Sequence, residues 1–385
     1  MQRFTPYLGI VAAVLLGVFI IIFSGSVSVL RAPAADTPIA SSTLSVLPSF
    51  SIPDITLPNL VPETSVVPAS SAVIPPAKES VAPVPKSSSP ATAPVPVTVL
   101  PIETAPVSNG GSLDAAALML RAALVNIICY VPPGSGLHSI SGSGVIIDPK
   151  GFILTNAHIA QYFLLADRGV SCTVRTGSPA AKSYGAALAY IPPAWISANA
   201  SVLTQAAPTG TGEHDFAFLA VTKSETATAL PAAFPSIPLA HSPPSFGTPV
   251  VIASYGAQFL ESSQVQSSLF PTVVFGSVKD VFTFNTNTID VLALGGSAAA
   301  QEGSSGGGVA DASGTLVGTV TTSTTEGATE TRSLDAITAS YIRSAYASAT
   351  GSALDLLLAK SPVTAAADFA PQIPTLEAIL TAHLP

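Results

Sequence analysis

The sequence predicts an all-β domain that follows an apolar N-terminal segment and a long proline-rich segment. This prediction rests on short β-branched runs separated by Gly, Pro and Ser after residue 112, on frequent prolines before it, and on an uncharged stretch near the N-terminus. Of the 385 residues, 48% are hydrophobic and 9% are charged, and the net charge is −8. An acidic chain without clusters of Lys and Arg is not expected to bind nucleic acid.

The uncharged stretch covers residues 7–30, from Tyr7 to Leu30, after a short segment at 1–6. At 1.5 Å per residue, a helix of this length can cross the ~30 Å hydrocarbon core of a bilayer. We therefore expect a transmembrane signal anchor that places the following domain on the extracytoplasmic side of the cell membrane. A cleaved signal peptide is the alternative, because small residues follow Phe23 and could form a cleavage site.

Prolines recur through residues 31–111, with Ser, Thr, Ala and Val between them. Each proline removes a backbone donor and biases the preceding residue toward extended conformations, so neither helix nor sheet can propagate. This composition predicts a disordered or polyproline-like stalk.

Residues 112–350 contain short apolar runs that are typical of strands, such as LVNIICYV, GSGVIID, GFILTN, PTVVFGSV and GTLVGTV. We expect about a dozen strands, which could divide into two six-stranded antiparallel barrels. Short helices are expected after Asn156 and over residues 337–349. Residues 351–385 form a tail of two short apolar segments separated by prolines, which could pack on the domain or on a partner.

Polar residues capable of catalysis stand at the edges of these runs. His158 follows an apolar strand in SGSGVIIDPKGFILTNAHIAQYF, Asp215 leads directly into DFAFLAV, and Ser305 lies in EGSSGGGVAD. Each residue alone is common in ordinary turns or cores. Their order along an all-β chain, His then Asp then Ser, favours nucleophilic catalysis by a serine.

These segments resemble the trypsin-like serine proteases, and specifically the HtrA/Deg-type branch. The family patterns are GSGvIid…G.ilTNaHV, D.AlL.v and GNSGGP, and this chain has GSGVIIDPKGFILTNAHIA, DFAFLAV and GSSGGG. The resemblance extends over roughly residues 115–350 and implies two six-stranded barrels, protein or peptide substrates, and a possible homo-oligomer. No regulatory PDZ domain is recognised after the protease domain.

The resemblance also implies the role of each site residue. Ser305, the serine immediately before the paired glycines, would attack the peptide carbonyl, and His158 would take its proton. Asp215 would orient the imidazole and stabilise its charged form. The N–H groups of Gly303 and Ser305 would form the oxyanion hole.

The sequence departs from the family pattern at Glu302 and Gly308, where proline is common. Either change could loosen the oxyanion turn. An alternative function is therefore a trypsin-like fold with latent or lost activity that serves as a cell-surface binding module. A secreted soluble protease whose leader has been removed is a further alternative.

The resemblance places Ala299 near the floor of the primary substrate pocket, and the strand around Thr321 at its wall. Alanine offers no carboxylate for a Lys or Arg side chain. We therefore expect cleavage after small or medium apolar residues.

The two cysteines of the sequence, Cys129 and Cys172, lie in the expected first and fourth strands. These strands could meet where a six-stranded barrel closes, so a disulfide is expected, and an extracytoplasmic location favours it. Two buried free thiols are the alternative. No cofactor is expected, and no metal site, because the five histidines are scattered without ligand spacing.

Overall fold

The computed structural model describes residues 112–205, 210–284, 287–324 and 326–384. The predicted segments 1–6, 7–30 and 31–111 lie outside these ranges. Within them, no helix is both long enough and apolar enough to cross a membrane.

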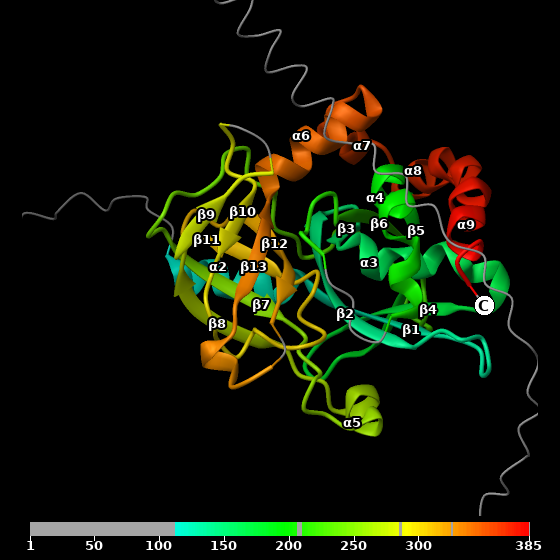
Figure 1. Cartoon of the computed structure of the whole chain (residues 1–385), viewed down its shortest axis with the longest axis horizontal. Helices are drawn as coiled ribbons and strands as arrows, with labels where there is room; N and C mark the ends of the chain where they lie inside the picture. The colour runs from blue at the N-terminus through cyan, green and yellow to red at the C-terminus, as the bar shows by residue number, and fades with distance from the viewer. Residues whose placement is uncertain (1–111, 206–209, 285–286, 325, 385) are drawn as a thin grey trace, which may run out of the picture. The chain divides into compact units, whose positions relative to one another are not determined.

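The first half of the described chain forms a closed antiparallel barrel with the strand order β1-β2-β3-β6-β5-β4 (Figure 1). Fully buried apolar side chains such as Val125, Ile127 and Ile153 share one face of its strands. The predicted six-stranded first barrel is thereby confirmed. Its strands are β1 Leu124–Tyr130, β2 Ile140–Asp148, β3 Phe152–Thr155, β4 Ser171–Thr176, β5 Ala181–Tyr190 and β6 Ala217–Ser224.

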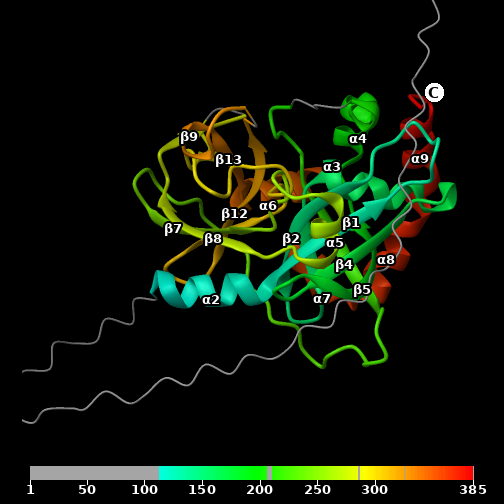
Figure 2. The same ribbon diagram turned by 90° about the horizontal axis from the view of Figure 1, so that it is seen from below.

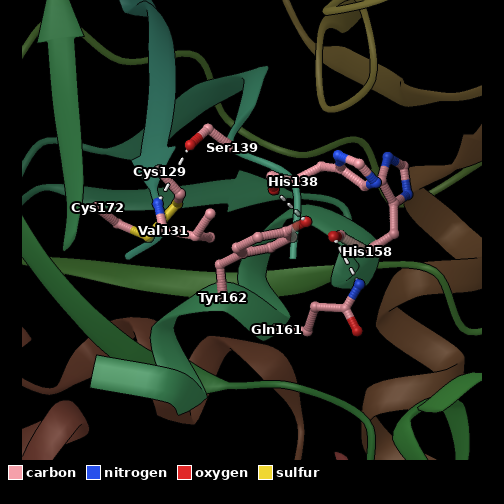
Figure 3. The surroundings of a disulfide bond; sticks show 8 residues. All are labelled: Cys129, Val131, His138, Ser139, His158, Gln161, Tyr162 and Cys172. Atoms are coloured by element: carbon pink, nitrogen blue, oxygen red, sulfur yellow. Dashed lines mark hydrogen bonds between the residues drawn. A yellow bond between two sulfur atoms is a disulfide. The ribbon is translucent and has the colours of Figure 1, made fainter. Parts of the chain in front are cut away.

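The barrel closes where β1 pairs with β4, and the register of this pair puts Cys129 directly opposite Cys172. The two residues form a disulfide, with Cα atoms 4.0 Å apart, so the predicted pairing is confirmed. Tyr162 extends between this disulfide and His158 (Figure 3), and its hydroxyl donates to the carbonyl oxygen of His138 at 2.9 Å. The disulfide, which lies where the barrel closes, is therefore on the same side of the barrel as the segment that carries His158.

Replacing both cysteines with alanine is expected to lower the free energy of unfolding by about 4 kcal/mol, because the bond closes a long loop in the unfolded chain. The two residues are separated by 43 positions. Guanidinium unfolding followed by the fluorescence of Trp195, the single tryptophan, measures this change. Dithiothreitol should lower the guanidinium midpoint of wild type to that of the double variant, and it should leave the midpoint of the double variant unchanged. A loss below about 1 kcal/mol would contradict the prediction.

The second half forms a sheet of seven strands in the order β8-β7-β11-β12-β13-β10-β9, rather than the predicted closed six-stranded barrel. In the described residues β8 pairs with β7 and β9 pairs with β10, and no ladder joins β8 to β9. Because β9 and β10 contain only three residues each, they offer little length for closure. The strands are β7 Pro249–Ser254, β8 Thr272–Ser277, β9 Asp280–Phe282, β10 Val291–Ala293, β11 Gly308–Asp311, β12 Leu316–Ser323 and β13 Leu334–Thr338.

A helix that the sequence analysis missed, α2 (Leu113–Ala123), precedes β1 and packs on β7 and β11. It begins at Ser112, whose side chain accepts the N–H of Ala115, and it carries Asp114 in its first turn and Arg121 in its last. Figure 2 shows it running beside the second sheet. Its side chain Leu120 is fully buried in the contact.

The predicted helix near residues 337–349 is confirmed as α6 (Ala339–Thr350). The tail after it forms helices α7 (Leu354–Ala359), α8 (Pro362–Phe369) and α9 (Ile373–Thr381), and the last two lie beside the first barrel (Figure 1). α8 packs on β5 and β6, while α9 packs on α4 (Pro193–Asn199) and on the 3₁₀ segment at Gln161–Arg168. The tail therefore supports the segment that follows His158.

Candidate active site

His158 lies where a buried strand of the first barrel turns into a short helix. β3 is buried throughout and ends at Thr155, and α3 (Ala157–Ala160) begins directly after Asn156. Asn156 is fully buried, and its Nδ2 donates to the carbonyl oxygen of Asp215 at 2.8 Å. This bond fixes the backbone around His158 relative to Asp215.

Asp215 leads into β6 from a turn in which Gly212 and His214 have left-handed backbone, with φ of +83° and +58°. The residue is only 6% exposed. Its Oδ2 lies 2.7 Å from His158 Nδ1 and accepts the Thr321 hydroxyl at 2.8 Å. Its Oδ1 accepts the backbone N–H of His158 at 2.9 Å. The structure thus brings His158 and Asp215 into direct contact, with both carboxylate oxygens bound.

The charge of Asp215 determines the tautomer of His158. Burial raises the pKa of the Asp215 carboxyl, but the charge of His158 and the hydrogen bonds from His158 and Thr321 outweigh burial, so the pKa is lowered. An ionised carboxylate can only accept hydrogen bonds, so Nδ1 of His158 carries the proton that points at Oδ2. In the neutral ring, Nε2 then keeps its lone pair and can take up a proton.

Thr321→Val is expected to lower the free energy of unfolding by about 1.5–3 kcal/mol near neutral pH, because it removes a hydrogen bond to a buried charged group. Since the folded-state pKa of Asp215 lies below the unfolded value of about 3.9, the ionised carboxylate stabilises the fold above about pH 4. This contribution is lost as the pH falls through the lowered folded-state value. Urea unfolding should therefore show a constant effect of the substitution from about pH 7 to pH 5 and a shrinking effect toward pH 2.

Thr319→Val is the matched control for this pH dependence. Thr319 is also buried, but its hydroxyl donates to a neutral acceptor, the carbonyl oxygen of Gly307, at 3.1 Å. Its effect on the free energy of unfolding should not change with pH. If the two variants showed the same pH dependence, the ionised state of Asp215 would not be what Thr321 stabilises.

The two neighbouring serines of the glycine-rich turn differ in access. Ser304 is 1% exposed, and its Oγ accepts the hydroxyl of Ser254 at 3.0 Å. Ser305 is half-buried, and within the described part of the chain its hydroxyl makes no hydrogen bond, including none to His158. Of the two hydroxyls, only that of Ser305 is accessible and unengaged.

The backbone of this turn lies against β2, the strand that pairs with β3. The N–H of Ser143, in β2, donates to the carbonyl oxygen of Ser305 at 2.8 Å. The carbonyl oxygen of Ser143 in turn accepts the Thr155 hydroxyl, from the end of β3, at 2.7 Å. Ser143 therefore joins Ser305 to Thr155, at the end of the strand that leads to His158, although Ser305 and Thr155 belong to different halves of the domain.

The turn also leaves two N–H groups without acceptors. The carbonyl of Glu302 accepts the N–H of Ala257 at 2.8 Å, and because a trans peptide directs its N–H opposite to its C=O, the N–H of Gly303 points away from Ala257. Gly303 has φ of +89°, and a Cβ there would lie 2.7 Å from the Tyr255 carbonyl oxygen, so only glycine fits. Among the described residues, no acceptor meets the N–H of Gly303 or of Ser305. Both groups can bind a negative charge that develops on an oxygen.

Residues 142–318 match the family model of the trypsin-like peptidase domain. This segment is similar to that domain family. Among solved structures, the chain is similar to the active form of the Rv3671c protease of M. tuberculosis, with 19% identity and a TM-score of 0.39, covering 66% of this chain and 95% of that chain. For the inactive form of the same protease the identity is 19% and the TM-score 0.39, with 61% and 92% covered. No curated protein matches the sequence.

The structure gives a physical reason for one departure of this peptidase domain from the family pattern. Gly308 begins β11, and a Cβ there would lie 2.6 Å from a methyl carbon of Leu120 in α2. Glycine at this position therefore accommodates the helix that precedes the barrel. Glu302 is exposed, and its carbonyl keeps the hydrogen bond from Ala257 that orients the turn.

The two residues predicted for the substrate pocket lie in different surroundings. Ala299 is fully buried beside Ala300 in the segment that leads to the turn. Thr321 directs its hydroxyl to Asp215, which sequence reasoning did not foresee. Its contact with the His–Asp pair is therefore its observed role, and the pocket assignment of both residues stays a prediction.

Arg332 is a buried residue that the sequence analysis did not single out. It is 5% exposed, and its guanidinium donates to the carbonyl oxygens of Ala300 at 2.7 Å and of Gly327 at 2.8 and 3.0 Å. It also donates to Gln258 Oε1 at 2.6 Å. One side chain thus joins three segments, one of which leads into the glycine-rich turn. A single arginine in TETRSLD carries no pattern from which this role could be predicted.

Proposed function

We propose that this protein is a serine endopeptidase that hydrolyses peptide bonds of protein substrates through His158, Asp215 and Ser305. The observation that carries the proposal is the Asp215 carboxylate, bound at both oxygens and only 2.7 Å from His158 Nδ1. This contact leaves Nε2 of His158 as the base. The accessible hydroxyl of Ser305 supplies the nucleophile, on a turn that is hydrogen-bonded to β2, the neighbour of the strand that leads to His158.

In the first half of the reaction, Ser305 Oγ bonds to the carbonyl carbon of the substrate while its proton passes to His158 Nε2. The carbonyl π bond opens, and the negative charge on its oxygen is met by the N–H groups of Gly303 and Ser305. Asp215 stabilises the imidazolium that forms. The C–N bond then breaks, the amine leaves with the proton from His158, and an acyl ester on Ser305 remains.

Water repeats the sequence in the second half. His158 takes a proton from water, the resulting oxygen nucleophile attacks the ester carbonyl, and the same two N–H groups stabilise the second tetrahedral intermediate. The bond between Ser305 Oγ and the acyl carbon then breaks, and Oγ recovers its proton from His158. No cofactor takes part in these steps.

A fluorophosphonate probe applied to the full chain tests the proposal, because it reacts only with an activated serine. The expected result is one adduct, mapped by peptide mass spectrometry to Ser305 and absent from His158→Ala. Fragment masses separate Ser305 from Ser304. A well-folded chain that forms no adduct, or one labelled at Ser304, would overturn the proposal and favour a latent domain that acts as a cell-surface binding module.

We propose that substrates are cleaved after small or medium apolar residues, since Ala299 offers no charge to a substrate side chain. Peptides that differ only in Val, Ala or Arg before the scissile bond provide the measurement. Preference for Arg would contradict this specificity.

We further propose that the enzyme is HtrA-like and is anchored by residues 7–30 with its peptidase domain on the extracytoplasmic side of the cell membrane. The uncharged run from Tyr7 to Leu30 and the disulfide support this placement. N-terminal sequencing of the mature protein from membrane fractions distinguishes an anchor from a cleaved leader. Size-exclusion chromatography with light scattering tests for a homo-oligomer.

A further inference from the structure

We propose that Ser143 is a positioning residue that holds the oxyanion turn in its reactive geometry. Ser143 lies in β2 of the first barrel and is fully buried, whereas the turn belongs to the second sheet. The inference rests on the function proposed above, because it concerns the same reaction. It assigns Ser143 a role in transition-state stabilisation without contact to the substrate.

The hydroxyl of Ser143 binds two backbone groups of the second sheet. It donates to the carbonyl oxygen of Gly303 at 2.8 Å and accepts the N–H of Tyr255 at 2.8 Å. Tyr255 directly follows β7, and Ala257, two positions later, orients the Glu302 peptide. A single hydroxyl therefore joins the turn to the segment that sets the direction of the Gly303 N–H.

The backbone of Ser143 adds two further contacts. Its N–H donates to the carbonyl oxygen of Ser305, and its carbonyl accepts the Thr155 hydroxyl. Gly306 has φ of +84°, and a Cβ at that position would collide with the Ser143 carbonyl oxygen. The turn and β2 are thus in closest contact at Ser143, and glycine is required there.

These contacts fix the carbonyl groups of both residues whose N–H groups face the oxyanion. Glycine has a wide choice of backbone conformations, so the bond to the Gly303 carbonyl adds to the bond between Ala257 and Glu302 in keeping the Gly303 N–H in place. Removing the hydroxyl would leave the buried Tyr255 N–H and the partly buried Gly303 carbonyl without partners. Because such groups are costly to leave unpaired, the turn is expected to rotate until they find new ones, and the Gly303 N–H then leaves the oxyanion position.

Ser141 provides a matched control on the same strand. It lies two positions before Ser143, so its side chain leaves the same face of β2. Its hydroxyl accepts from Asn126 Nδ2 at 2.9 Å and contacts no part of the turn. Ser141→Ala therefore removes a hydroxyl from the same strand without touching the oxyanion donors.

Steady-state hydrolysis of a peptide amide by the full chain is the first test. Losing one oxyanion donor costs about 10²–10³ in rate, so displacing one is expected to lower kcat of Ser143→Ala about 10- to 100-fold. KM should stay within about twofold, because substrate binding in the ground state does not use the oxyanion contact. Ser143→Cys, whose thiol is a weaker donor and acceptor, should fall between wild type and Ser143→Ala, and it serves if the alanine variant does not fold.

A peptide aldehyde with a ¹³C-labelled carbonyl gives a readout that a loss of stability would not move. Ser305 Oγ adds to the carbonyl carbon, its proton passes to the hemiacetal oxygen through His158 as the C=O π bond opens, and this oxygen occupies the position of the oxyanion. Its ionisation, followed by the ¹³C shift against pH, should occur about one to two pH units higher in Ser143→Ala than in wild type or Ser141→Ala.

The outcomes separate this inference from the proposed function. A wild-type chain that forms no hemiacetal would overturn the proposed function, and the inference with it. A wild-type adduct whose ionisation and kcat are matched by Ser143→Ala would overturn the inference alone. A reduced kcat with an unshifted hemiacetal titration would also overturn it, because Ser143 would then support only the fold.

Discussion

Ser305→Ala is expected to lower kcat for a peptide amide by about 10⁶-fold, with a change in the free energy of unfolding below about 1 kcal/mol. The hydroxyl has no hydrogen-bond partner in the described part of the chain, so its removal leaves no buried group unpaired. The proposed reaction, in contrast, loses its nucleophile. Steady-state hydrolysis and chemical denaturation of the same preparation measure the two effects.

Ser304→Ala is the control, because it alters the adjacent hydroxyl of the same turn. Its Oγ accepts the hydroxyl of Ser254, so the alanine variant should lose about 1–2 kcal/mol of stability and at most about tenfold in kcat. Ser305→Ala is thus expected to lose activity with little loss of stability, whereas Ser304→Ala is expected to lose stability with a much smaller loss of activity. Comparable losses of kcat in both variants would mean that the turn as a whole, and not Ser305 in particular, supports the reaction.

The residues that carry the proposed chemistry could be predicted because each stands in a short continuous motif. TNAHIA places a histidine at the end of a buried strand, DFAFLAV places an aspartate before one, and GSSGGG places a serine among glycines. The disulfide was also predictable, since the first and fourth strands meet where the barrel closes. These features depend on local sequence or on a simple closure.

Contacts between distant segments could not be predicted in the same way. Thr321 reaches Asp215 across 106 positions, and Ser143 reaches Gly303 across 160, and neither residue lies in a pattern that indicates its partner. The open second sheet follows from the short length of β9 and β10, which the sequence does not indicate. The prolines of the tail do not by themselves predict its helices, although proline fits in the first turn of a helix, where Pro362 of α8 and Pro374 of α9 stand.

Asp215→Asn is expected to lower kcat by about 10⁴-fold while leaving the geometry of the site nearly intact. In wild type, Oδ1 accepts the backbone N–H of His158 and Oδ2 accepts its Nδ1–H. An asparagine has one oxygen and one NH₂ for these two places. Because the backbone N–H can only donate, the asparagine oxygen should remain there, and the NH₂ should face Nδ1 of the ring.

This arrangement reverses the tautomer of His158. With an amide donor at Nδ1, the ring proton moves to Nε2, which can then no longer accept the proton of Ser305. ¹⁵N chemical shifts of labelled histidine in the Asp215→Asn chain should show Nε2 protonated, whereas in wild type the proton is on Nδ1. Thr321→Val removes only one of the two hydrogen bonds to Oδ2 of Asp215. Because Oδ2 still accepts from Nδ1 of His158, kcat should fall by no more than about tenfold. If His158 kept its proton on Nδ1 in the Asp215→Asn chain and kcat still fell by about 10⁴-fold, the role of Asp215 would be to stabilise the charged imidazole rather than to select the tautomer.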